Sequence, residues 1–212
     1  MYPNTNAAAW QALWQGFGVA LPDSQWFEDL QRHYREPNRA YHTLVHIDDS
    51  LQLFAQLAHL ASQPAIVRAA LWFHDVFYDS TRSDNEEASA QWAAEIMHAA
   101  GVPLSTVSRV QELILYTQHS QTPPAGDGAL LVDIDLAILG AATVRFDEYE
   151  SQIRAEYAWV PWLTFCRRRA ALLQQFLARP TIYQTDYFQH HFEERARQNL
   201  ARSIRHLETL VL

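Results

Sequence analysis

Apolar residues along most of the chain recur at intervals of three and four positions, the spacing that places them on one face of an α-helix. One such series is Leu51, Phe54, Ala55 and Ala58, and a second runs through residues 107–117. No segment alternates apolar and polar residues as a half-buried strand does. The pattern therefore predicts an all-α protein.

This periodicity places the expected helices over residues 6–17, 23–35, 43–62, 64–79, 84–100, 104–119, 130–140, 143–159, 162–178 and 186–210. Residues typical of helix ends fall between them. Ser83 followed by Glu86 has the form of a capping box, and Gly101 followed by Pro103 has the form of a helix stop and restart. The segment 120–128 is the clearest loop, because its paired prolines and two glycines do not continue a helix.

The length and composition favour one globular domain. The chain has 212 residues, of which 49% are hydrophobic and 19% charged, and it contains no internal repeat or low-complexity tract. A chain of this size buries most of its unfolded surface in a single core. We therefore expect a single helical domain over residues 1–212.

The charge and the single cysteine exclude several classes of protein. The net charge is -8, so no basic surface for long nucleic acids is expected, although a bound cation would still allow a small phosphorylated ligand. Cys166 has no partner for an internal disulfide, and the N-terminus lacks the basic leader of a signal peptide. No apolar stretch reaches the roughly 20 residues that span a bilayer. We expect a cytoplasmic protein without membrane anchoring.

One predicted helix carries a polar pair in apolar surroundings. Residues 65–78 read AIVRAALWFHDVFY, which is apolar almost all round except at Arg68, His74 and Asp75. A helix of this kind is buried on most of its circumference. A buried carboxylate is costly unless it is paired, hydrogen-bonded or bound to a metal. Asp75 therefore needs a compensating partner.

Other regions supply residues that would complete a metal site with this pair. His46 lies in the preceding helix, His119 ends a later one, and Asp133 and Asp135 lie in the next. A mixed imidazole and carboxylate set suits a divalent Mn, Fe, Co, Ni, Zn or Mg ion. Each piece also has a simpler reading, because a His–Asp pair occurs often by chance and Asp133 is placed to cap the helix near it.

The order His46, then His74 with Asp75, then a downstream aspartate resembles the H…HD…D signature of the HD superfamily of metal-dependent phosphohydrolases. Surrounding segments are similar to those of a small bacterial HD family of predicted phosphohydrolases. The similarity extends from about residue 10 to the C-terminus, through RAYHTLVHIDD (39–49), WFHDVFYD (72–79), DNEEASAQ (84–91), VDIDLAILG (132–140), YESQIRAEY (149–157) and ERARQNL (194–200).

The resemblance implies an all-α HD-type bundle that binds a divalent cation and hydrolyses a small phosphorylated metabolite, with a nucleotide as the first candidate. Its metal ligands would be His46, His74, Asp75 and one further aspartate. We favour Asp135 for the last position, because the signature aspartate usually precedes a Leu-rich helical stretch such as LAILG. Asp133 is the substitute.

Further roles follow for neighbouring residues. His42 is expected outside the helix start, behind the ligands or facing the substrate. His119 corresponds to an extra histidine that binds a second metal or a phosphate in many superfamily members, and a polar helix end is the equal alternative. Glu86 or Glu87 would act as general base on an attacking water, although Glu86 also fits the capping box. Arg39 is the expected phosphate clamp, because it lies in the RAYH segment.

Three functions remain open at this point. The first is phosphoester hydrolysis. The second is a regulatory module in which the same site binds a nucleotide without turnover. The third is oxidation at a two-iron site, which His42 and His119 would help to build.

Arg154 and Arg169 are further phosphate-clamp candidates, but pairing with acids such as Glu148 or Glu150 is the more frequent use of arginine.

Overall fold

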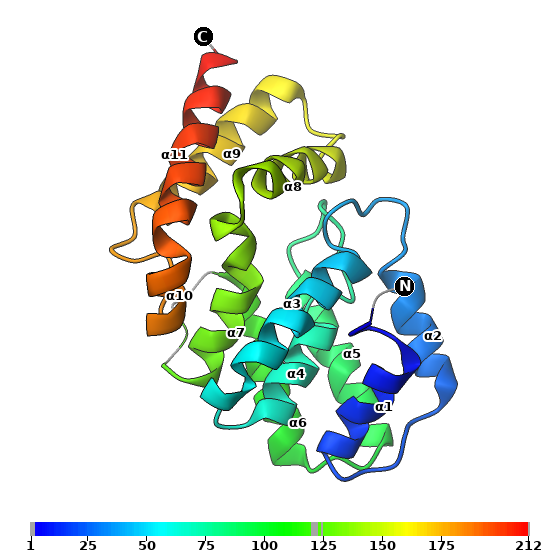
Figure 1. Cartoon of the computed structure of the whole chain (residues 1–212). Coiled ribbons are helices and arrows are strands. Elements are labelled where there is room, and N and C mark those ends of the chain that lie inside the picture. Colours follow the sequence, from blue (N-terminus) through cyan, green and yellow to red (C-terminus); the bar gives the residue numbers. More distant parts are fainter. Residues whose placement is uncertain (1–2, 120–122, 124, 212) are drawn as a thin grey trace. The chain divides into compact units, whose positions relative to one another are not determined.

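The computed structural model describes residues 3–119, 123 and 125–211, and within these ranges it contains helices and no strand (Figure 1). The all-α prediction is confirmed. The chain divides into two compact units, Met1–Asp135 and Leu136–Leu212. The prediction of a single domain stays a prediction. No helix among the described residues is long and apolar enough to cross a membrane.

The first unit is built around one central helix. Helix α4 (Pro64–Phe73) packs against α1, α3, α5, α6 and α7 (Figure 1). These neighbours span Ala7–Gly16, Leu44–Leu57, Asn85–Ala99, Leu104–Leu115 and Asp127–Asp135, and the unit also contains α2 (Ser24–His33) and the short 3-10 helices η1 (Ala58–Leu60) and η2 (Tyr116–Gln118). The apolar run predicted a helix buried on most of its circumference, and residues 69–73 are all buried.

Aromatic side chains fix the end of α4 that leads into the His74–Asp75 pair. Trp10 lies edge-on to Trp72 and to Phe73, with ring centroids 5.6 and 5.9 Å apart. Trp14 adds a contact to Phe73 at 6.5 Å. Buried aromatic rings contribute large apolar areas to a core. The position of residue 74 is therefore set by rigid neighbours.

Two expected features around the pair are wrong. Helix α4 ends at Phe73 with His74 as its C-cap, so Asp75 lies in the following turn and not on a helix that continues to residue 79. Helix α5 begins at Asn85, and its N-cap Asp84 makes no side-chain capping bond, so the expected capping box is absent. Glu86 therefore does not have the capping role that the sequence suggested.

Other boundaries also differ from the expected ones. Helix α7 begins at Asp127, inside the expected loop 120–128, of which residues 120–122 and 124 lie outside the described residues. Gly101 does end a helix, with the left-handed φ of +79° that favours glycine, and Pro103 caps α6. The last expected helix is interrupted at Phe192.

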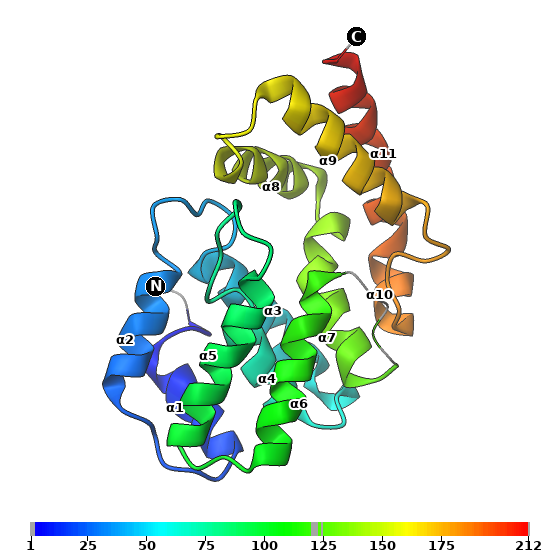
Figure 2. The ribbon, with the colours of Figure 1, turned by 180° about the vertical axis from the view of Figure 1, so that it is seen from behind.

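The second unit contains η3 (Leu136–Gly140), α8 (Thr143–Glu156), α9 (Trp162–Leu177), α10 (Asp186–His191) and α11 (Glu193–Thr209). Helices α9 and α11 lie side by side (Figure 2). Arg169 of α9 is buried and pairs with Glu150 of α8, which also accepts a hydrogen bond from Ser203 of α11 at 2.8 Å. Arg169 therefore has the interhelix use expected of an arginine beside an acid.

Gly140 is required where η3 meets the end of α10. A Cβ atom at this position would lie 2.8 Å from the Phe192 carbonyl oxygen and 2.8 Å from its Cβ atom. We expect Gly140→Ala to lower the free energy of unfolding by about 1–3 kcal/mol, the usual effect of overpacking. Gly16→Ala is the control, because its new Cβ would lie at an ordinary 3.5 Å from Ala65. Urea titrations followed by circular dichroism would measure both, and equal midpoints would contradict the close contact.

Candidate metal centre

Four side chains at or just beyond the ends of three helices meet at one place in the first unit. His46 lies in the first turn of α3, which begins after Thr43 because the Thr43 side chain accepts a hydrogen bond from the Val45 amide. His74 and Asp75 follow the end of α4, and Asp135 is the last residue of α7. Helix ends thus place two imidazoles and two carboxylates together.

The distances between these groups fit a divalent cation. The Nε2 atoms of His46 and His74 are 3.1 Å apart. Asp75 Oδ2 lies 3.5 and 3.1 Å from these two nitrogens, and Asp135 Oδ1 lies 3.2 and 3.4 Å from them. An ion bound at about 2.0–2.2 Å holds neighbouring donors roughly 2.8–3.6 Å apart, for angles between about 90° and 109°. All five distances fall in this range.

The hydrogen bond on the far side of the His74 ring prepares it as a ligand. His74 Nδ1 lies 3.1 Å from the Leu71 carbonyl oxygen, which only accepts hydrogen bonds. In the neutral ring the proton is therefore on Nδ1, and the lone pair of Nε2 points toward His46 and the two carboxylates. Metal-binding histidines use the same arrangement to fix their tautomer.

The carboxylates favour a positive charge between the imidazoles. Burial by itself disfavours the charged forms of His74, Asp75 and Asp135. The charge of Asp75 and the hydrogen bonds that the His74 ring donates to both carboxylates outweigh burial and hold the pKa of His74 well above its usual value. The histidines in turn lower the pKa of Asp75 and of Asp135. The same two carboxylates would stabilise a divalent cation bound between the imidazoles.

Asp135 rather than Asp133 makes the contacts described above. Positions two apart on a helix point about 200° apart, so the two aspartates do not face the same way. Asp133 is fully buried within α7, and α7 begins six residues before it, so the alternative that Asp133 caps a helix start is wrong. The geometry therefore favours Asp135 as the fourth ligand.

The two additional histidines lie next to these ligands. His42 precedes α3, as expected, and its ring stacks on Tyr78 with centroids 3.9 Å apart. Its charge lowers the pKa of Asp75. His119 follows η2 with a left-handed φ of 54°, and its Nε2 atom lies 3.1 Å from Asp135 Oδ2, the oxygen not facing His46 and His74. Their substrate roles stay predictions.

The two general-base candidates differ in their surroundings. Glu86 is half-buried, and burial together with the nearby charge of Asp75 raises its pKa. Glu87 is exposed, and its carboxylate accepts a hydrogen bond from Gln118 Nε2 at 2.7 Å. The environment favours Glu86 as the base, because a raised pKa brings a carboxylate closer to neutral pH. Both roles stay predictions.

Arg39 is engaged with the protein itself. Its Nη1 atom donates to the carbonyl oxygens of Asp75 at 2.6 Å and His42 at 3.1 Å, and its Nη2 atom donates to the carbonyl oxygen of Val76 at 2.8 Å. Its Nε group donates to Glu36 at 3.0 Å, and the side chain is 0% exposed. These contacts favour a role in holding the Asp75 turn. The phosphate-clamp role stays a prediction that they do not support.

Two aromatic residues near the centre were missed in the sequence. Tyr34 donates its hydroxyl to the Trp72 carbonyl oxygen at 2.9 Å, and burial with the nearby Asp75 charge raises its pKa. Tyr78 supports the His42 ring. Tyr78 lies only three residues after Asp75, so its position in the WFHDVFYD segment was the available signal. Tyr34 has no such signal, because its partner is 38 residues away.

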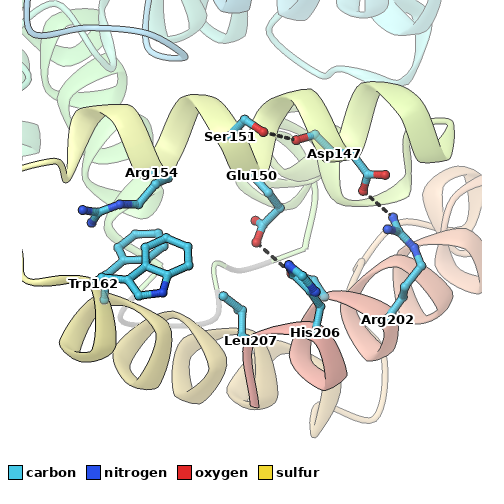
Figure 3. A pocket seen from close by; sticks show the side chains of 10 residues that line it. Asp147, Glu150, Ser151, Arg154, Trp162, Arg202, His206 and Leu207 are labelled. Atoms are coloured by element: carbon cyan, nitrogen blue, oxygen red, sulfur yellow. Dashed lines mark hydrogen bonds and ion pairs between the residues drawn. The ribbon is translucent and has the colours of Figure 1, made fainter. Parts of the chain in front are cut away.

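The second unit contains a pocket of about 400 Å³ between α8, α9 and α11 (Figure 3). Arg154 at one end donates to the carbonyl oxygens of Tyr157 and Val160 and lies over the Trp162 ring. Arg202 pairs with Asp147 at 2.6 Å. Because both arginines already bond to protein groups, this pocket is a weaker candidate for a functional site than the cluster in the first unit.

Comparison of the chain with protein-family models, with curated proteins and with solved structures gave no match. The likeness to the HD superfamily therefore rests on the sequence motif. The distances between the four side chains support a metal site on separate grounds, because they do not follow from the order of the residues along the chain.

Proposed function

We propose that this protein is a metal-dependent phosphohydrolase that acts on a small phosphorylated metabolite, with a nucleotide as the first candidate. The observation that carries the proposal is the cluster of His46, His74, Asp75 and Asp135 at the spacing of a divalent site. The donor set suits Mn, Mg, Co, Ni, Fe or Zn. The side chains of Asp75 and Asp135 are 15% and 13% exposed, whereas those of the two histidines are at most 4% exposed.

The exposure of these side chains indicates from which side a substrate would approach. The two imidazoles are buried and the carboxylates are partly exposed, so we expect a phosphate to approach on the side of the carboxylates. A bound cation would polarise a phosphoryl oxygen and lower the pKa of a water molecule. His42 would hydrogen-bond a phosphate oxygen, and His119 would do so by exchanging its Nε2 contact with Asp135 Oδ2 for the phosphate. Glu86 would take the proton of the attacking water.

One observation favours the two-iron oxygenase as a second candidate. Asp135 has both oxygens engaged, Oδ1 with His46 and His74 and Oδ2 with His119. A carboxylate used in this way is suited to bridge two metal ions. Absence of iron from protein expressed in iron-rich medium would remove this candidate, because a two-iron oxygenase requires iron, whereas the phosphohydrolase does not depend on this particular metal.

Turnover tests the proposal directly. Purified protein loaded with each candidate metal is incubated with nucleotides and phosphorylated metabolites, and released phosphate is measured. We expect hydrolysis of at least one compound, reduced to the chelated background by Asp75→Ala, because this change removes an anionic ligand. Glu112→Gln, at a carboxylate 47% exposed on α6, should keep wild-type activity. Tight nucleotide binding without phosphate release would select the regulatory module instead.

A further inference from the structure

A buried carboxylate joins the starts of two helices that both lead to the metal centre. Asp127, the first residue of α7, is 5% exposed. Its Oδ1 atom accepts the backbone amide of Ser62 at 2.7 Å, and its Oδ2 atom accepts that of Gln63 at 2.9 Å. These partners lie 65 and 64 positions earlier in the chain, immediately before α4.

Helix α4 has no cap of its own at this end. Its N-cap Gln63 makes no side-chain capping bond, and Pro64 in the first turn has no amide hydrogen to donate. Amides at a helix start need acceptors, and a negative charge there is favourable. Asp127 of α7 supplies both the accepting oxygens and the negative charge.

The opposite ends of the same two helices carry metal ligands. Helix α4 runs from this contact to His74, and α7 runs from Asp127 to Asp135. The two helices pack against each other. A helix rises about 1.5 Å and turns about 100° per residue, so a slip of one residue in α7 would displace and rotate Asp135 away from His74.

We propose that Asp127 is a positioning residue that sets α4 and α7 in register and thereby fixes the spacing of His74 and Asp135. The inference rests on the proposed metal centre. A second contact supports it, because α7 is also closely packed at its start. A Cβ atom at Gly128 would lie 3.1 Å from the Tyr116 ring, so α7 has little room to shift.

Metal affinity of the folded variants tests this inference. Dissociation constants for Mn²⁺ and Zn²⁺ are measured by calorimetry, at a temperature where circular dichroism shows each metal-free variant folded. We expect Asp127→Ala to weaken binding by about 10-fold or more, as loss of a residue supporting metal ligands does. Asp127→Asn should be intermediate, because its amide retains one accepting oxygen, and it carries the test if Asp127→Ala does not fold.

Glu193→Ala is the matched control. Glu193, the first residue of α11 in the second unit, accepts the backbone amides of Ile182 at 3.0 Å and Tyr183 at 3.2 Å, so its loss removes the same kind of contact without removing one made by α4 or α7. It should lower the melting temperature and leave the dissociation constants unchanged. If both Asp127 variants bind the metals like the wild type, Asp127 is only structural and the inference is overturned. If the wild type binds neither metal, the metal centre itself is overturned, and this inference with it.

Discussion

His74→Ala should lose most of the stabilisation that a divalent cation gives to the wild-type protein, together with the activity. The proposed site exists only in the folded chain, so a cation at ~100 times its dissociation constant would add about 2.7 kcal/mol to the free energy of unfolding. His74 is buried, and its Nε2 atom faces the other three proposed ligands. Without this nitrogen the remaining groups bind a cation weakly.

Melting curves with and without chelator measure this effect. The wild type should melt at a lower temperature after chelation, whereas His74→Ala should hardly respond. Glu87→Ala is the control, because Glu87 is exposed and its carboxylate bonds to Gln118 and not to a proposed ligand among the described residues, so the melting temperature of this variant should respond to chelator as that of the wild type does. An equal response of His74→Ala and wild type would show that His74 is not a ligand.

The helices were predictable because their core-facing residues repeat with the period of the helix itself. The proximity of the proposed ligands was predictable from residue type and order, since a buried carboxylate in apolar surroundings needs a compensating charge. His46, His74, Asp75 and Asp135 do lie together in the structure. The distances between these four side chains could not be predicted from the sequence, because they depend on how the helices pack.

The errors arise where contacts between distant residues override a local pattern. The apolar run to Tyr78 favours a longer helix, but the chain turns at Asp75, where Arg39 holds two successive carbonyl oxygens. The capping box expected at Ser83 does not form. Instead, the Asn85 side chain accepts a hydrogen bond from the Asp79 amide and donates one to the Asp79 carbonyl oxygen. Asp127 gave no signal, since its partners are more than 60 residues away.

Arg39→Ala should lower the free energy of unfolding by about 3 kcal/mol, the low end for breaking a buried charged pair. The low end applies because the partner carboxylate of Glu36 is 34% exposed and regains some solvation. The larger share of the loss comes from the carbonyl oxygens of Asp75, Val76 and His42, which lose a charged donor. The turn that presents Asp75 should loosen, so metal affinity should fall as well.

Urea titration measures the stability of three variants, and calorimetry measures their metal affinity. Together they separate the contribution of the guanidinium geometry of Arg39 from that of its charge. Arg39→Lys keeps the charge but cannot reach three carbonyl oxygens and Glu36 in one plane, so it should recover only part of the stability. Arg32→Ala is the control, because Arg32 is 68% exposed and pairs with Asp29 at the surface, where loss of such a pair changes stability by about 0.3–0.5 kcal/mol. If Arg39→Ala keeps wild-type stability and metal affinity but loses phosphate release, Arg39 contacts substrate and the phosphate-clamp role is the correct one.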